Sequence, residues 1–146
     1  MTIAIRPLTE ADHSSWASLF GDYISFYRSH LSPEQYDLTW GRLIGDFPLH
    51  GLLAEVDGDV VGLAHFLFRP STWSPTDFCY LEDLFVSPGH RGRGVGRALI
   101  AEVGQIARKK GAPRLYWTTA PDNTIARALY DSVAITDRVQ YKILLD

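Results

Sequence analysis

Residues 78–97 read FCYLEDLFVSPGHRGRGVGR, a stretch that joins a strand, a glycine-rich turn and the start of a helix. Aromatic and aliphatic residues dominate 78–86 and predict a strand, which Pro88 and Gly89 end. From Gly94 onward the apolar residues recur at helical spacing. A strand that leads directly into a helix in this way predicts a mixed α/β sheet with one parallel crossover.

The turn between this strand and the helix has the composition of an anion-binding loop. Its glycines let the backbone approach a ligand with successive N–H groups pointing outward, and the helix adds the positive end of its dipole. The alternative is a flexible turn that carries surface arginines. The turn consists of Arg91, Gly92, Arg93, Gly94, Val95, Gly96 and Arg97.

Two common phosphate-binding patterns fail in this turn. The Walker pattern needs a lysine where Val95 stands. The dinucleotide fingerprint needs a third glycine where Arg97 stands. The glycine spacing therefore predicts a site for diphosphate-like oxygens without identifying the ligand.

Two adjacent carboxylates, Glu82 and Asp83, interrupt the apolar strand. Strand alternation puts Glu82 on the face of Leu84, and Asp83 on the opposite face with Leu81. A carboxyl group in an apolar row tends to have a raised pKa, which suits a general base for an ammonium group. For Asp83, pairing with a nearby arginine remains an alternative.

A third motif begins at Asp122, where Asp122 or Asn123 is expected to cap a helix over 124–133. Tyr130 lies at the border of the apolar stripe of this helix, where packing and catalysis are both possible roles. We expect His65 to be a hydrogen-bonded sheet residue and Cys79 a buried small hydrophobe.

Helices and strands alternate through the rest of the chain, and 1–146 is expected to form a single domain. The segment 69–77 has two prolines and no period, so it is expected to be a loop. Leu38, Leu43 and Ile44 are expected to line the buried side of the second helix. The other expected elements are strands 3–6, 52–56, 60–68, 115–119 and 139–145, and helices beginning near Thr9 and Ser32.

Composition excludes several classes of protein. Of the 146 residues, 46% are hydrophobic and 21% charged, which is the globular range, and the formal charge of −3 argues against nucleic acid as a partner. The single cysteine and the lack of clustered ligands argue against a disulfide or a metal site. Neither a signal peptide nor a membrane span is recognisable, so a cytoplasmic protein is expected.

Three pieces together resemble the GNAT superfamily of acetyl-CoA-dependent N-acetyltransferases: Leu84-Phe85-Val86, Arg91-x-x-Gly94-x-Gly96 opening a helix, and Asn123 seven residues before Tyr130. The run 80–83 and the stretch 116–130 are similar to the spermidine/spermine acetyltransferases and the yeast histone-and-polyamine acetyltransferase group. The resemblance implies the acyl-CoA N-acyltransferase fold, a mixed, mostly antiparallel twisted sheet flanked by helices.

The resemblance also implies roles for individual residues. Glu82 would take a proton from the amine, directly or through water, Tyr130 would protonate the departing CoA thiolate, and Glu82 and Asp83 would attract a cationic acceptor. No metal is implied. The residues implied to bind acetyl-CoA are Leu84, Phe85, Val86, Arg91, Gly92, Arg93, Gly94, Val95, Gly96, Arg97 and Asn123.

The expected acceptor is a small primary amine, a polyamine or an amino acid. Acetylation of a protein lysine or amino terminus is a second possibility, and an acyl-CoA-binding regulator without turnover is a third. One departure from the family pattern lies at 133–136, where a glycine and an aromatic residue are usual. Relatives with similar carboxyl ends often dimerise there, so 139–145 is the expected edge of a homodimer.

Overall fold

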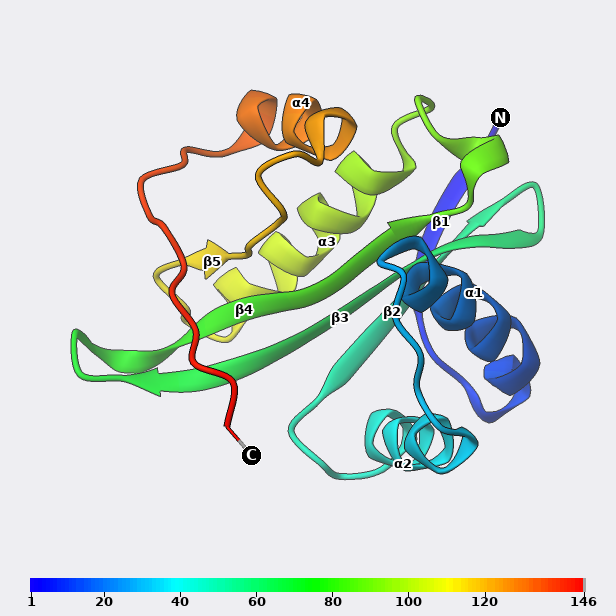
Figure 1. Cartoon of the computed structure of the whole chain (residues 1–146), viewed down its shortest axis with the longest axis horizontal. Coiled ribbons are helices and arrows are strands. Elements are labelled where there is room, and N and C mark those ends of the chain that lie inside the picture. The colour runs from blue at the N-terminus through cyan, green and yellow to red at the C-terminus, as the bar shows by residue number, and fades with distance from the viewer. Residues whose placement is uncertain (146) are drawn as a thin grey trace. The chain divides into compact units, whose positions relative to one another are not determined.

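The computed structural model describes residues 1–145, which form two compact units: a sheet unit, Met1–Tyr116, and a C-terminal unit that begins at Trp117. The sheet unit contains all the strands, which follow one another across the sheet in sequence order (Figure 1). Neighbours are antiparallel except β4 and β5, which are parallel, as the sequence predicts. The strands are β1 (Ile3–Pro7), β2 (His50–Val56), β3 (Asp59–Ser71), β4 (Ser74–Val86) and β5 (Leu115–Tyr116).

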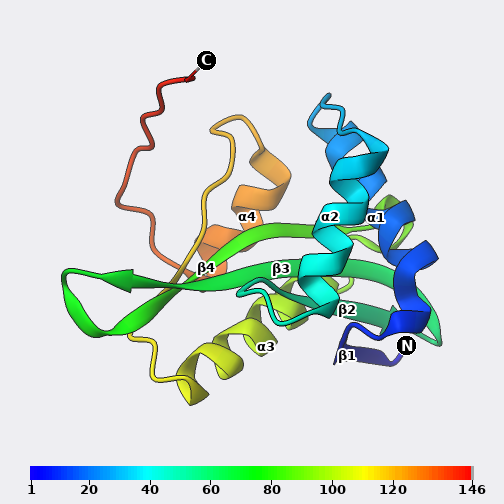
Figure 2. The same cartoon turned by 90° about the horizontal axis from the view of Figure 1, so that it is seen from below.

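Helices cover both faces of the sheet. Helices α1 (His13–Phe26) and α2 (Pro33–Ile44) lie on one face and α3 (Val95–Lys109) on the other (Figure 2). Short 3-10 turns precede α1 (Glu10–Asp12) and follow β4 (Pro88–His90). The core under α1 is built from the buried side chains of Trp16, Leu19, Phe20, Leu53, Leu63 and Phe85.

The second helix begins as expected but turns a different face to the core. The Ser32 hydroxyl accepts a hydrogen bond from the Gln35 N–H at 3.1 Å, which confirms the cap. Leu38, however, is 47% exposed, so its expected burial is wrong. The expected packing of Leu43 is confirmed. Because residues three and four apart share a helix face, Tyr36 and Trp40 pack against the core with it.

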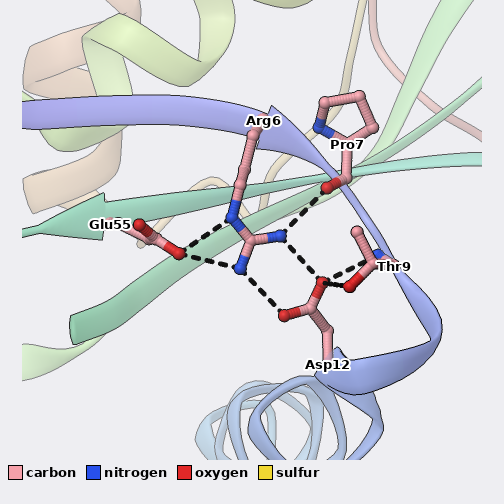
Figure 3. A network of polar contacts seen from close by, with 5 residues as sticks. All are labelled: Arg6, Pro7, Thr9, Asp12 and Glu55. Carbon is pink, nitrogen blue, oxygen red and sulfur yellow. Dashed lines mark hydrogen bonds and ion pairs between the residues drawn. The ribbon is translucent and has the colours of Figure 1, made fainter. Parts of the chain in front are cut away.

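A polar network fixes the entry into α1 (Figure 3). The Arg6 guanidinium bridges Asp12 (2.7 Å) and Glu55 (2.8 Å), and one oxygen of Asp12 also accepts from the Thr9 N–H at 2.7 Å. The hydrogen bond from Arg6 holds the pKa of the Asp12 carboxyl far below its usual range. This network joins β1, β2 and the start of α1, and Thr9 is the N-cap of the turn that leads into this helix.

The loop expected over 69–77 is instead the end of a long hairpin. Strands β3 and β4 pair out to Ser71 and Ser74, and Trp73 in the turn is 88% exposed. The guanidinium of Arg69 lies 5.2 Å from the Phe78 ring opposite it and donates a hydrogen bond to the Tyr116 hydroxyl. These cross-strand contacts stabilise an extended conformation in a segment that has no hydrophobic period of its own.

In the C-terminal unit, α4 (Thr124–Val133) coincides with the expected helix. The expected strand 139–145 is wrong: residues 134–145 pair with no strand and are exposed. The expected strand 115–119 is likewise shorter, since β5 covers only Leu115–Tyr116. A strand needs a hydrogen-bonded partner, which an alternating sequence pattern cannot supply by itself.

The packing of α3 on the sheet predicts a contrast between two glycines. A Cβ on Gly62 in β3 would lie 3.1 Å from the Phe85 carbonyl oxygen and 3.3 Å from side chains of α3, whereas a Cβ on Gly41 in α2 would meet nothing within 4 Å. Gly62→Ala should therefore lower the free energy of unfolding by about 1–3 kcal/mol through overpacking. Gly41→Ala, the matched control, should raise it by about 0.5–1 kcal/mol through helix propensity. Urea unfolding of both variants checks this, and equal effects would contradict the close approach of α3.

Candidate functional site

The two carboxylates of β4 lie at a β-bulge. Asp83 pairs with His65 in β3 while Leu81 pairs with the next residue, Phe66, so Glu82 is the extra residue without a cross-strand partner. Because of the bulge, the strict alternation of faces expected along 81–84 is wrong. Leu84 pairs with Ala64, which shares a face with Phe66, so Leu81 and Leu84 lie on one face although they are three residues apart.

Asp83 points to the face covered by α1 and bonds to a histidine, not to the arginine that was one alternative. Its Oδ2 lies 2.9 Å from His65 Nδ1. The other ring nitrogen of His65, Nε2, accepts a hydrogen bond from the Trp16 indole N–H at 2.9 Å. His65 is thus a fully hydrogen-bonded sheet residue, as expected, and Trp16, His65 and Asp83 form one buried chain of hydrogen bonds.

Glu82 is exposed, in contrast to Asp83, whose side chain is 17% exposed. Partial desolvation raises the pKa of the Glu82 carboxyl, and the neighbouring charge of Asp83 raises it further. On the α1 side, burial raises the pKa of Tyr23, and the charge and a hydrogen bond of Asp83 add to the effect. The site thus presents the accessible carboxyl group of Glu82, which has a raised pKa, beside the carboxylate of Asp83, which is already hydrogen-bonded to His65.

Next to these carboxylates, one edge of β4 has no strand beside it. Strand β5 pairs with β4 only at Cys79 and Tyr80, so within Met1–Tyr116 no strand borders the edge from Leu81 to Val86. The Ser87 N–H points to β3, where it donates to the Val61 carbonyl. Because backbone groups alternate along a strand, those of Leu84 and Val86 point to the open edge. Within Met1–Tyr116, the backbone groups of Leu84 and Val86 therefore face an edge that no strand borders, and the Val86 carbonyl there accepts a hydrogen bond from Arg91.

The open edge leads into the glycine turn. Gly92 and Gly94 have φ of 77° and 86°, in the left-handed region, and a Cβ on either would meet nothing within 4 Å. Gly94 is the N-cap of α3, so the first N–H groups of a 15-residue helix point into the space beyond the turn. This is the geometry of an anion-binding helix terminus.

The arginines of the turn differ in what they contact. The Arg91 guanidinium donates to the Val86 carbonyl oxygen at 3.0 Å and lies over the rings of Phe26 and Phe85, 5.3 and 5.4 Å from their centroids. Arg91 therefore anchors the turn to the end of β4. Arg93 and Arg97 flank the N-terminus of α3, where their positive charges add to the positive end of the helix dipole.

In the C-terminal unit, Asn123 and Tyr130 lie at the start and in the last turn of α4. Asn123 occupies the N-cap position, but its side chain donates to the Thr119 hydroxyl at 3.1 Å and does not cap the helix. Tyr130 is partly buried and packs edge-on against Trp117, with 5.5 Å between ring centroids. Its ring is thus fixed by an aromatic neighbour from the same unit.

Sequence reasoning missed the parts played by Trp16 and Tyr23 and the bulge itself. A histidine and an aspartate in neighbouring apolar strands were a signal, but only the strand register shows that they are partners.

Among residues 1–145 no group of three or more His, Cys, Asp or Glu side chains is placed to hold a metal ion. No helix in the described part of the chain is long and apolar enough to cross a bilayer.

Comparison with known sequences identifies relatives along most of the chain. The model of the Acetyltransferase (GNAT) family matches residues 16–134. The D-amino-acid N-acetyltransferase HPA3 of Saccharomyces cerevisiae is 35% identical over 144 residues, 96% of this chain and 89% of the relative. A thialysine N-epsilon-acetyltransferase of Caenorhabditis elegans is 35% identical over 85 residues, 58% of this chain and 52% of the relative.

Solved structures share the fold at lower identity. The aminoglycoside enzyme AAC(6')-Iy, in complex with the bisubstrate analog CoA-S-monomethyl-acetylneamine, is 22% identical with a TM-score of 0.84 and covers all of both chains. The ribosomal-protein-alanine N-acetyltransferase of Brucella melitensis biovar Abortus 2308 is 23% identical with a TM-score of 0.84, over 99% of this chain and 100% of that one. These structures show the same fold.

The burial of Cys79 predicts an inert thiol. Cys79 is fully buried in β4, and burial raises its pKa to about 11. Since the thiolate is the reactive form, Cys79 in the folded protein should not react with a disulfide reagent such as DTNB at pH 7.5. In urea one equivalent of thiol per chain should appear at once. Fast labelling of the folded protein would contradict this expectation.

Proposed function

This chain belongs to the GNAT family of acetyltransferases and is an N-acetyltransferase, and from that premise we propose that it acetylates the primary amine of a small molecule. The observation that carries the proposal is the exposed Glu82 on a bulge, beside Asp83 and next to the open edge of β4. The two relatives named above act on a D-amino acid and on thialysine, by their names, which supports an amino acid or polyamine as the acceptor.

The geometry of the sheet unit fits acetyl-CoA as the donor. The pantetheine arm has amide groups that can hydrogen-bond to the edge-facing backbone of Leu84 and Val86, in the manner of an added strand. The diphosphate fits the helix terminus, where Gly92 and Gly94 leave the space open. Bound there, acetyl-CoA would supply a thioester to an incoming amine at the end of the open edge. We further propose that Asn123 helps to hold it.

The proposed acid–base roles follow from the state of each group. A free amine with a pKa of about 10.4 is protonated at neutral pH and must lose a proton before it attacks. Glu82 is exposed and has a raised pKa, so it suits the role of general base, directly or through one water. Tyr130, whose ring is held by Trp117, would donate a proton to the departing thiolate. No covalent intermediate on the protein is required.

The acidic pair favours a cationic acceptor. Glu82 is exposed for contact, and Asp83 adds negative charge from a less exposed position. A protein lysine or amino terminus, and an acyl-CoA-binding regulator, remain the alternatives that assay must exclude. We also propose that both units act as one N-acetyltransferase domain, since the family match runs from 16 to 134, across both.

A homodimer through residues 139–145 is part of the same proposal. Val139, Tyr141 and Ile143 alternate along this segment and are 78%, 92% and 85% exposed. An extended segment with one apolar row is complementary to a second copy of itself or to a sheet edge of a second copy. A cytoplasmic location fits a chain whose one cysteine is a free thiol.

An amine panel tests the proposed function. The purified protein is incubated with acetyl-CoA and polyamines, D- and L-amino acids, diamino acids or lysine peptides, and the release of CoA thiol is followed. Small amines should give the highest kcat/KM. Tyr130→Phe should lower kcat by about tenfold or more and leave CoA affinity nearly unchanged. CoA binding without thiol release for any amine would refute the enzyme, and preference for peptides would favour the protein-directed alternative.

Two glycines of the turn test the donor site. Gly94 has φ of 86° and Gly89 has no positive φ, while a Cβ at either meets nothing within 4 Å. Gly94→Ala should weaken CoA binding by about tenfold because the backbone at the N-cap must change, and this corresponds to roughly 1.4 kcal/mol. Gly89→Ala is the control and should bind CoA normally. Calorimetric titration measures both, and equal affinities would place the diphosphate elsewhere.

A further inference from the structure

The strongest unexplained feature lies beside the proposed base. His65 in the middle of β3 is 2% exposed, and Trp16 in α1 is fully buried. The indole N–H of Trp16 can only donate a hydrogen bond, so His65 Nε2 must accept and carries no proton. The remaining proton is then on Nδ1, which donates to Asp83 Oδ2 at 2.9 Å. The hydrogen-bond chain therefore runs in one direction, from Trp16 through a neutral His65 to the carboxylate of Asp83.

The hydrogen-bond chain meets β4 at the β-bulge. The strand register shifts between His65 and Phe66, directly where His65 is bonded to Asp83. If Asp83 were released from His65, β4 could slip into regular pairing, because a bulge leaves its extra residue without ladder hydrogen bonds. In regular pairing Glu82 would move to a different face. The bond between His65 and Asp83 thus selects the register that exposes Glu82.

We propose that Trp16, His65 and Asp83 are positioning residues: their hydrogen-bond chain fixes the bulge that presents Glu82, and Asp83 acts through Glu82 without itself contacting the amine. This inference rests on the proposed function for the importance of Glu82. It assigns Asp83 a different task from Glu82, although the two carboxylates are adjacent in the sequence.

The contacts of Asp83 leave little of it for a substrate. His65 occupies one oxygen, the Tyr23 hydroxyl interacts with the same carboxylate from α1, and the side chain is 17% exposed. An amine would have to displace these partners and leave a buried histidine N–H without an acceptor, which is unfavourable. The exposed neighbour Glu82 offers an acceptor without that cost. Direct binding of the amine to Asp83 is therefore disfavoured.

The charged and titratable groups around Glu82 affect its pKa in different directions. Asp83 on β4 raises the pKa of Glu82 after the larger effect of desolvation, and a protonated His65 on β3 would lower it. From α1, Tyr23 approaches Asp83, and burial raises the pKa of Tyr23, so its hydroxyl remains neutral near pH 7. Removal of the Asp83 charge should therefore shift the Glu82 titration to lower pH.

Three variants separate positioning from substrate binding. Asp83→Asn removes the charge but keeps an oxygen that can accept from His65. His65→Gln keeps a donor for Asp83 and an acceptor for Trp16, so it should replace the neutral imidazole. His65→Leu has similar bulk and removes both hydrogen bonds. The readouts are the ¹³C NMR titration of the Glu82 carboxyl in the free protein, and kcat and amine KM as functions of pH with acetyl-CoA.

The expected result is a distinct pattern for each variant. Asp83→Asn should lower the midpoint of the Glu82 titration and move the acidic limb of kcat/KM the same way. Amine KM should rise by no more than about threefold, because the acceptor loses the attraction of one charge but no direct contact. His65→Gln should retain most activity. His65→Leu should lower kcat by about tenfold or more and change the amide shifts of residues 81–83.

Two other results would overturn the proposal. One is a rise of about tenfold in amine KM for Asp83→Asn with the Glu82 titration unchanged, because Asp83 would then bind the amine directly. The other is full activity and unchanged amide shifts at 81–83 in His65→Leu, since the chain would then not position the bulge. Failure of the proposed function would give a different result. The Glu82→Gln variant would then keep the wild-type pH profile of kcat/KM, while the Asp83→Asn variant would still show a shifted NMR titration of Glu82.

Discussion

A histidine buried in the middle of the sheet constrains much of this structure. Both ring nitrogens of His65 need partners, because an unsatisfied polar group in the core costs about 1–3 kcal/mol. Trp16 supplies the donor and Asp83 the acceptor, at 2.9 Å each. For these three groups to meet, α1 must cross β3 at Trp16 and β4 must pair with Asp83 opposite His65. One polar requirement thereby fixes the position of a helix and the register of a strand.

In the proposed function, the same strand serves the two substrates in different ways. Within Met1–Tyr116, the edge of β4 that faces away from β3 has no strand beside it from Leu81 to Val86, since β5 ends after pairing with Tyr80. Beyond Val86 the chain turns through Gly92 and Gly94 into α3. The close packing of α3 at Gly62 holds the helix N-terminus near the end of β4. The edge of β4 and the N-terminus of α3 are thus held at a fixed separation. This arrangement fits the proposed donor, acetyl-CoA, which needs backbone hydrogen bonds along its pantetheine arm and an anion site for its diphosphate.

The chemistry of the proposed reaction is divided between backbone and side chains. In this proposal, recognition of the donor rests on backbone groups of β4 and α3, which tolerate many side chains as long as the glycine conformations are kept. The acceptor meets side chains, and Glu82 is the one that is both exposed and raised in pKa. Differences in acceptor among relatives with the same fold are consistent with this division, because only the side-chain part needs to change.

The sequence by itself determined the parts of this protein that depend on local physics. The glycine turn with its following helix, the helix over 124–133, the Ser32 cap and the order of most elements could be predicted from spacing and capping. The sequence and the family resemblance also singled out Glu82, Asp83, Asn123 and Tyr130 as candidates, and their roles stay predictions. The segments 69–77 and 139–145 could not, because strand formation depends on a partner from elsewhere in the chain. Tertiary structure alone decided the register of β3 and β4. That register pairs His65 with Asp83, makes Glu82 the extra residue of the bulge and gives two neighbouring carboxylates different surroundings, since a shift of one residue would exchange their faces.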